Sequence, residues 1–312
     1  MKFGIIGSGF GYDSHFKALE KIKGVEIVGI TDSGSGKVIS KLSKPNIYFK
    51  SIEALIQANP NVITIATPPI HHLGLITKLA KNNIHIVCEK PFCISTKQAL
   101  NSISLIEKYG LSNCINFQYR FEPGIEFLKS KLNDQIIDEI ESIEVIWLTS
   151  GGNDPSRLWS WRNEKKQGGG VINDFLIHVF DLIQWLVKSE IEDIVESKSK
   201  ILTPLRKADN LGIKPVTAED FVEVDLKLKD NIHAFCKVSN CYQKSTGMRI
   251  TLNGKNSKLI YEHKPPFRPG DQSVFLEKNG KKTQIFNAAY SIPDFYKDTR
   301  TFSIRELYIK FI

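Results

Sequence analysis

The first 117 residues alternate short apolar runs with amphipathic stretches. The apolar runs, rich in Val and Ile, lie at 2–6, 26–31, 62–66, 84–88 and 114–117, and the amphipathic stretches at 14–22, 51–58, 71–82 and 95–109. Runs that are apolar throughout are typical of parallel strands covered on both faces. The pattern therefore predicts an N-terminal α/β domain with a doubly wound parallel sheet, whose strands are joined by right-handed crossovers.

The pattern changes beyond residue 120. A strand-like run at 139–149 is followed by a glycine-rich loop and a helical stretch at 170–187, and then by strand-like runs at 221–228, 232–239, 248–252, 257–262, 273–277 and 282–286. Two of the links, Asn253-Gly254 and Asn279-Gly280, are typical of type I′ hairpin turns. We expect residues 1–120 to form the first domain and residues 121–312 a C-terminal α+β domain with an open, mainly antiparallel sheet.

Composition narrows the class of protein. The 312 residues are 41% apolar and 24% charged, as in a soluble globular chain long enough for two domains. The net charge of +8 comes from Lys and Arg spread along the chain, so no nucleic-acid partner is expected. We find no signal peptide and no run near the ~18 apolar residues that cross a membrane. Five cysteines without a CxxC pair predict reduced thiols in a cytoplasmic protein and no metal site.

The first strand runs directly into a glycine-rich turn. Gly7 would allow the tight turn, and Gly9, with Phe10 beside it, would let the backbone approach a pyrophosphate at the start of a helix. The third glycine of this nucleotide-binding pattern is replaced by Tyr12. Either the helix packs less closely here, or Gly11 takes over that position.

Polar residues follow the next strands at the ends where open α/β sheets bind ligands. Asp32 would accept hydrogen bonds from the adenosine ribose and repel a 2′-phosphate, which favours NAD over NADP; the alternative is a turn residue. Lys37 nearby keeps NADP open as the less favoured cofactor. Further candidate cofactor-binding residues after the third and fourth strands are Thr67, Pro68, His72, Glu89 and Lys90.

The stretch 170–187 carries a polar stripe. At ~100° per residue, Asp174, His178, Asp181 and Trp185 fall one above another, opposite an apolar face formed by Ile172, Phe175, Val179, Ile183 and Leu186. Histidine suits a general acid/base near neutral pH, and Asp174 would orient it. The alternative is an ordinary solvated helix face.

Other polar residues are weaker candidates for substrate binding. Trp161 and Arg162, just before the glycine-rich loop, would bind substrate hydroxyls or a phosphate, or be structural. Tyr119 and Arg120, next to Asn116 at the domain junction, would contact the ligand or pack a hinge. His15, in the first turn of the first helix, is interpreted as a local helix cap, with contact to the nicotinamide or pyrophosphate as the alternative.

Together these segments resemble the Gfo/Idh/MocA family, the group of glucose–fructose oxidoreductase and inositol dehydrogenase. The matching segments are GIIGSGFGYDSH at 4–15, ATPPIHH at 66–72, EKP at 89–91, NFQYRF at 116–121, WSWR at 159–162 and GGGVINDFLIHVFD at 168–181. The resemblance implies that Lys90 is the active-site lysine, followed by a cis proline, and that Asp174 and His178 are the family's D-x-G-x-H pair. Leu176 replaces the glycine of that pair. The family also implies sugar-like or cyclitol substrates and a homodimer or homotetramer built on the second domain's sheet.

The expected function is that of an NAD(P)-dependent oxidoreductase. It would transfer a hydride between nicotinamide and a hydroxyl or keto carbon of a sugar, nucleotide-sugar or cyclitol. His178 would carry the proton, Asp174 would orient it, and Lys90 would polarise the reacting oxygen; the roles of Lys90 and His178 could also be exchanged. Two alternatives remain, namely an NAD(H)-binding regulator without turnover and an enzyme of the same fold acting on a non-sugar.

Overall fold

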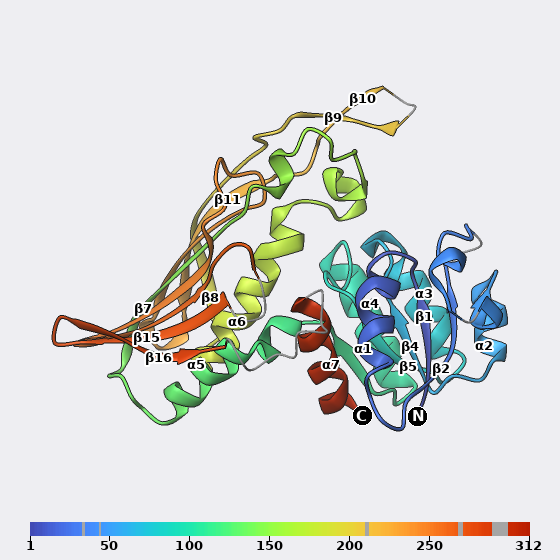
Figure 1. The fold of residues 1–312 in the computed structure, drawn as a ribbon, viewed down its shortest axis with the longest axis horizontal. Coiled ribbons are helices and arrows are strands. Elements are labelled where there is room, and N and C mark those ends of the chain that lie inside the picture. The colour runs from blue at the N-terminus through green and yellow to red at the C-terminus, as the bar shows by residue number, and fades with distance from the viewer. Residues whose placement is uncertain (33–34, 44, 210–211, 268–270, 289–298) are drawn as a thin grey trace. The chain divides into compact units, whose positions relative to one another are not determined.

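The computed structural model describes residues 1–312 except 33–34, 44, 210–211, 268–270 and 289–298. It divides into two compact units (Figure 1). The first joins Met1–Gln118 to helix α7 (Thr299–Phe311), and the second begins at Tyr119. The expected limits, 1–120 and 121–312, put α7 in the second unit. It belongs to the first because Ile304, Leu307 and Tyr308 are buried there, where α7 packs on α1 (Lys17–Leu19) and the π-helical turn η1 (Gly11–Phe16).

The first unit is built on a six-stranded parallel sheet. Its strands are β1 (Lys2–Ile6), β2 (Glu26–Thr31), β3 (Tyr48–Phe49), β4 (Val62–Ile65), β5 (His85–Cys88) and β6 (Asn113–Ile115), in the order β3-β2-β1-β4-β5-β6. This is the strand order of dinucleotide-binding folds, in which the chain reverses direction of winding between β1 and β4. The predicted doubly wound parallel sheet is confirmed.

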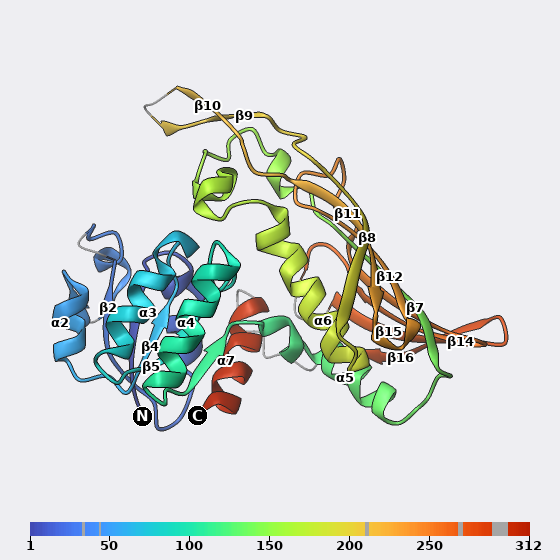
Figure 2. The same ribbon diagram turned by 180° about the vertical axis from the view of Figure 1, so that it is seen from behind.

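Helices cover both faces of this sheet. Helices α1 and α7 lie on one face, and α3 (His72–Ala80) and α4 (Thr96–Lys108) on the other (Figures 1 and 2). The core on the side of α3 also takes in Leu55 from α2 (Ile52–Gln57). Because both faces are covered, strands such as β4 are buried at every position, which explains their unbroken apolar runs.

The second unit is built on an eight-stranded mixed sheet. Its strands are β7 (Ile140–Leu148), β8 (Ile191–Lys200), β11 (Phe221–Leu228), β12 (His233–Ser239), β13 (Gly247–Gly254), β14 (Ser257–His263), β15 (Gln272–Lys278) and β16 (Lys281–Asn287). The order is β16-β15-β14-β13-β7-β12-β11-β8, and only the β7–β12 pair is parallel within this described sheet. The predicted open, mainly antiparallel sheet is confirmed. A separate two-stranded sheet joins β9 (Leu205–Lys207) to β10 (Ile213–Pro215).

Two helices pack on one face of the large sheet. Helices α5 (Pro123–Asn133) and α6 (Ile177–Val187) lie on the same side of it (Figures 1 and 2) and share a core with the inward side chains of the strands. The opposite face carries no helix in the part of the chain that the structure describes. Edge strand β8 was not predicted, because nearly all its side chains are exposed and no apolar alternation marks it.

The two predicted hairpin turns have different outcomes. At the β15–β16 link, Asn279 and Gly280 adopt φ values of 54° and 73°, as a type I′ turn requires. Asn253 and Gly254 instead belong to β13, and the turn falls at 255–256. The predicted position was wrong because an acceptor outside the hairpin fixes the turn: the Asp138 carboxylate accepts the N–H of Asn256 at 2.9 Å.

One stretch of the second unit meets the length and composition of a membrane-spanning helix. It runs from Lys165 to Val187 with a mean hydropathy of 1.4, so the expectation that no such stretch exists was wrong. In the structure 44% of an 18-residue window of this stretch is buried, and Val179, Leu182 and Ile183 lie in the core of the second unit. A buried core helix passes the same test, so this stretch is weak evidence for a membrane.

Two glycines of the first unit test how backbone conformation contributes to its stability. A Cβ would meet nothing within 4 Å at Gly110 or at Gly74, but Gly110 has φ +59° and Gly74 lies within α3. We predict that Gly110→Ala destabilises the protein by about 1 kcal/mol, whereas Gly74→Ala stabilises it by about 0.5–1 kcal/mol. Urea unfolding followed by circular dichroism measures both changes. Equal signs would mean that φ at position 110 differs from that described.

Candidate active site

The glycine-rich turn after β1 has the shape that a bound pyrophosphate needs. A Cβ on Gly7, which has φ +137°, would lie 2.3 Å from the carbonyl oxygen of Ala66, so only glycine fits the turn. A Cβ on Gly9 would meet nothing within 4 Å, which leaves the backbone open to a ligand. A Cβ on Gly11 would lie 3.2 Å from the Ile5 side chain. Gly11 therefore provides the close helix–strand contact, and these residues fit the cofactor.

The two aromatic residues of the turn have different surroundings. Tyr12 is 7% exposed, donates a hydrogen bond to the carbonyl of Lys41, and stacks on Phe16. Phe10 lies edge-on to His15, with ring centroids 5.4 Å apart, and the Arg300 guanidinium lies 4.9 Å from its centroid. Tyr12 is thus buried against the segment that contains Lys41, whereas Phe10 remains partly exposed.

The carboxylate of Asp32, at the end of β2, holds the following loop. It accepts hydrogen bonds from the Tyr48 hydroxyl at 2.8 Å and from the N–H groups of Gly36 and Val38 at 3.1 and 3.2 Å. Burial acts to raise the pKa of Asp32, but these hydrogen bonds outweigh it and leave the pKa below its usual value. The turn role left open by the sequence is therefore observed, and the fixed negative charge also suits the rejection of a 2′-phosphate.

His72, predicted as a cofactor ligand, is fully buried in the structure. Its ring nitrogens lie 3.1 Å from the carbonyl oxygen of Phe92 and 3.0 Å from that of Thr67. Burial lowers its pKa, although the two carbonyls favour the protonated ring. With both nitrogens occupied, His72 joins the loops after β4 and β5. Thr67 and Pro68 remain the predicted cofactor-binding residues of this loop.

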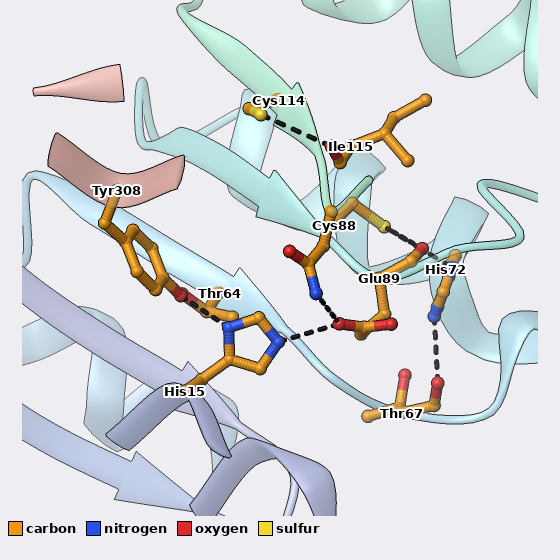
Figure 3. A network of polar contacts seen from close by, with 10 residues as sticks. His15, Thr64, Thr67, His72, Cys88, Glu89, Cys114, Ile115 and Tyr308 are labelled. Atoms are coloured by element: carbon orange, nitrogen blue, oxygen red, sulfur yellow. Dashed lines mark hydrogen bonds and ion pairs between the residues drawn. The ribbon is translucent and has the colours of Figure 1, made fainter. Parts of the chain in front are cut away.

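Glu89, directly after β5, lies at the centre of a network of buried polar groups (Figure 3). Its Oε1 accepts hydrogen bonds from His15 Nε2 at 2.8 Å and from the Asn116 amide at 2.5 Å. Burial acts to raise the pKa of Glu89. The hydrogen bond and charge of His15, the charge of Lys90 and the Asn116 hydrogen bond reverse this and lower the pKa.

The network continues through His15 to the C-terminal helix. The other ring nitrogen, Nδ1, lies 2.7 Å from the Tyr308 hydroxyl, which lies 2.7 Å from Thr64 Oγ1 on β4 (Figure 3). His15, Thr64 and Tyr308 are fully buried, and burial raises the pKa of Tyr308, which stays a neutral phenol. His15 is therefore a bridge between Glu89 and α7, where a local helix cap was expected.

Lys90 follows Glu89 and is partly exposed. The Lys90–Pro91 peptide bond is cis, as the family resemblance implied. Among the predicted residues of the first unit, Gly7, Gly9, Thr67, Glu89 and Lys90 all follow the carboxyl ends of parallel strands, which is the ligand-binding edge of such a sheet.

In the second unit, His178 lies near the start of α6, next to a π-helical turn, η9 (Ile172–Leu176). It is 2% exposed. The Tyr119 ring lies edge-on to it at 4.7 Å, and the Trp147 ring is tilted against it at 6.5 Å, centroid to centroid. The solvated-face alternative for this stripe is therefore wrong at His178, which sits among aromatic rings.

The rest of the stripe is held by cations of the same unit. Arg120 binds both carboxylate oxygens of Asp181, at 2.8 Å from its Nε, and also lies over the Trp185 ring. Burial raises the pKa of Asp181, partly offset by Arg120. Farther along, Arg162 Nε lies 3.6 Å from Asp174 Oδ2. Through Tyr119 and Arg120, the segment at the start of the second unit contacts α6 at His178 and, one turn later, at Asp181.

The glycines of the loop before α6 allow close packing against neighbouring groups. A Cβ on Gly169 would lie 2.4 Å from the carbonyl oxygen of Arg162, and one on Gly170, with φ +104°, would lie 2.2 Å from the Glu219 carboxylate. Glu219 accepts the N–H of Ile172 at 3.2 Å. The Trp161 ring lies under the Arg162 guanidinium at 4.5 Å. A carboxylate therefore occupies the start of this helical segment.

Comparison with known proteins identifies the family. Residues 1–117 match the model of the oxidoreductase family with an NAD-binding Rossmann fold, and residues 125–260 match the GFO/IDH/MocA C-terminal domain. The chain belongs to the Gfo/Idh/MocA family of NAD-binding oxidoreductases. The resemblance stated from the sequence is thereby confirmed.

Several members of the Gfo/Idh/MocA family are similar to this chain. Glucose-6-phosphate 3-dehydrogenase of Bacillus subtilis is 26% identical, over 83% of this chain and 74% of the relative. Inositol 2-dehydrogenase of Rhizobium meliloti is 22% identical, over 85% and 77%. Among solved structures, levoglucosan dehydrogenase in complex with NADH and L-sorbose has a TM-score of 0.85 at 18% identity, over all of this chain and 88% of the other. That structural likeness shows the shared fold.

Three residues that make these contacts were not suggested by the sequence. Tyr308 and Glu219 are distant in sequence from the groups they contact, and Tyr48 lies on a two-residue strand. Asn116 was a candidate for ligand contact or hinge packing, and its amide donates to Glu89 instead. A sequence motif consists of residues close together along the chain. Contacts between residues distant in sequence therefore leave no motif that would predict them.

The loop before α6 generates a stability prediction. In Gly170→Ala the new Cβ collides with Glu219 at a backbone angle that disfavours alanine, so we expect a loss of about 2–3 kcal/mol of unfolding free energy. Gly151→Ala, in the same unit with open space around its Cβ, should change it by less than about 0.5 kcal/mol. Denaturant unfolding of both variants provides the test. Equal small effects would show that the loop accommodates a side chain at 170.

Proposed function

We propose that this Gfo/Idh/MocA protein oxidises or reduces one hydroxyl or keto carbon of a sugar, nucleotide-sugar or cyclitol with NAD(H). The observation that carries the proposal is the placement of His178, a histidine 2% exposed among aromatic rings, on a helical segment whose two carboxylates, Asp174 and Asp181, lie against arginines. Named relatives act on glucose-6-phosphate and inositol, which supports a polyhydroxylated substrate.

The residues divide the chemistry among them. The cofactor, when bound, supplies the hydride acceptor or donor. In oxidation, His178 accepts the proton of the reacting hydroxyl, because a neutral imidazole nitrogen is a base suited to neutral pH. Lys90 donates a hydrogen bond to the same oxygen and stabilises the charge that develops there. Asp174 orients His178. In reduction the proton moves the other way, from His178 to the carbonyl oxygen.

The charge balance of the second unit favours an uncharged substrate. Both arginines predicted to bind substrate, Arg120 and Arg162, lie against the carboxylates of Asp181 and Asp174. Glu219 occupies the start of the helical segment. An added phosphate would face these carboxylates and would have to compete with them for the guanidinium groups. We therefore place neutral sugars and cyclitols ahead of sugar phosphates.

The thiols support an intracellular setting. All five cysteines are free. Burial raises the pKa of Cys88 and of Cys236, which keeps them as unreactive thiols. Free, buried cysteines are typical of proteins kept in a reducing compartment, and we propose that the protein works in the cytoplasm.

The function is tested by incubating the protein with NAD⁺ or NADH and a panel of sugars, nucleotide-sugars, keto-sugars and inositols. We expect a change in nicotinamide absorbance with at least one neutral member. We expect turnover to fall by about 10²–10⁴-fold in His178→Asn and in Lys90→Met, because each removes a group that acts in the transition state. Lys108→Met, on the exposed end of α4, serves as the matched control.

Unchanged turnover in both variants would contradict the assigned roles. Binding of NADH without turnover of any compound would instead favour the regulator of the same fold. Turnover only with sugar phosphates would overturn the preference for neutral substrates.

We also propose that the protein is a homo-oligomer built on the helix-free face of the large sheet. This face contains a hollow of about 600 Å³, lined among others by Glu144, Asp225, Arg249 and Lys258. Val195 of edge strand β8 also lines this hollow and is 61% exposed. Apolar groups mixed with both signs of charge suit pairing with a second copy.

The oligomer is tested by sedimentation velocity. Wild-type protein should sediment as a dimer or tetramer, and Val195→Asp should lower the association constant by at least tenfold, because it buries an unpaired charge. Leu100→Asp places the same charge on α4 of the first unit, at a site 59% exposed, and should leave association unchanged. A wild-type monomer at all concentrations would refute the proposal.

A further inference from the structure

The hydrogen-bond chain through His15 can run in two directions. With a neutral His15, Nε2–H donates to Glu89, and Nδ1 accepts from Tyr308, whose oxygen accepts from Thr64. With a protonated His15, Nδ1–H donates to Tyr308, whose hydroxyl then donates to Thr64. In both cases Glu89 receives a hydrogen bond from Nε2. The phenol adapts to either ring state, so the geometry holds Glu89 as an anion.

The fold places this anion on one side of the cofactor. In this strand order a dinucleotide crosses the edge of the sheet at the switch point between β1 and β4. Asp32, after β2, marks the adenosine side. The nicotinamide half then belongs on the opposite side, over the ends of β4 and β5. Glu89 and Lys90 directly follow β5.

At the ends of β4 and β5, the oxidised nicotinamide would lie close to another positive charge. Oxidised nicotinamide carries a positive charge on its ring, and the reduced ring carries none. Lys90 is a second cation, whose charge acts on Glu89. Two cations this close repel each other. The repulsion weakens the binding of NAD⁺ and does not affect NADH, whose nicotinamide ring is uncharged.

We propose that Glu89 is the counter-charge that favours NAD⁺ over NADH, and that His15 and Tyr308 are positioning residues that hold this charge in place. The proposal rests on the function proposed above, in that it takes the first unit as the NAD site and Lys90 as a group of that site. It adds that the C-terminal helix, through Tyr308, adjusts which redox form of the cofactor binds more tightly.

Each group that faces Glu89 fits this assignment. His15 comes from η1, and Asn116 follows β6; both donate to Oε1. The charge of Glu89 also acts on His72, on the Cys88 thiol and on Tyr308. Of these, burial lowers the pKa of His72 and raises the pKa of Cys88 and Tyr308, so burial favours the neutral form of all three. None of these three neutral forms offsets the charge of the carboxylate.

The test measures two dissociation constants without any substrate, NAD⁺ by calorimetry and NADH by its fluorescence. Glu89→Gln keeps the shape and an acceptor oxygen but removes the charge. We expect NAD⁺ to bind about tenfold more weakly and NADH to change by less than about twofold. An equal change in both constants would overturn the proposal.

Tyr308→Phe provides a second, independent test that leaves Glu89 in place. Without the hydroxyl, His15 is no longer fixed, Glu89 loses part of its stabilisation, and the pKa of Glu89 rises. The preference for NAD⁺ should then fall as the pH is lowered from 8 to 6, whereas the wild-type preference stays constant. Tyr109→Phe, in α4's C-terminal cap and outside the network, should match the wild type. A flat pH profile in Tyr308→Phe would remove the positioning role.

These binding constants separate the two proposals. If no sugar or cyclitol is turned over and the ratio of constants still shifts in Glu89→Gln, the proposed substrate class fails and the counter-charge stands. If turnover is found and the ratio does not shift, the enzyme stands and the counter-charge fails. A variant that unfolds is recognised by its circular dichroism, and the other variant then decides.

Discussion

The burial of one carboxylate organises the first unit. An ionised carboxylate loses several kcal/mol of hydration when it leaves water, and Glu89 can be buried only because His15 and Asn116 donate to it. Those two donors come from the segments that follow β1 and β6, and His15 is in turn fixed by Tyr308 from α7. Four segments distant in sequence must therefore meet before the charge is satisfied, so the network ties the ligand-binding edge of the sheet to the last helix.

In the second unit, buried or half-buried carboxylates are stabilised by ion pairs with arginine. On α6, the carboxylate of Asp181 is matched by Arg120, which comes from the segment at the start of the unit. The neighbouring Tyr119 packs its ring against His178. Two consecutive residues therefore fix the position of the helix and the setting of the histidine together. Fixed ion pairs leave few polar groups on this face to reorganise, which suits a site that must hold a proton carrier in one orientation.

The sequence predicted the features that depend on local pattern. Buried parallel strands appear as unbroken apolar runs, and the Gly7 turn carries its own signature. Features that depend on distant contacts were not predicted. The turn at 255–256 is held by Asp138, strand β8 has almost no buried face, and α7 has no pattern that assigns it to the first unit. For the site, the motif positions of Lys90 and His178 were found, whereas Tyr308 and Glu219 were not, because they act on groups far along the chain.

The return of α7 to the first unit has a consequence for the order in which the protein is made. Translation delivers the parallel sheet first, then the whole second unit, and α7 afterwards. Until α7 arrives, only α1 and η1 cover their face of the sheet, and His15 lacks the phenol that fixes its ring. The second unit is thus inserted between two parts of the first, and the first unit is completed last. The incomplete first unit must remain soluble while about 180 further residues are synthesised, at a rate of roughly 5–20 residues per second.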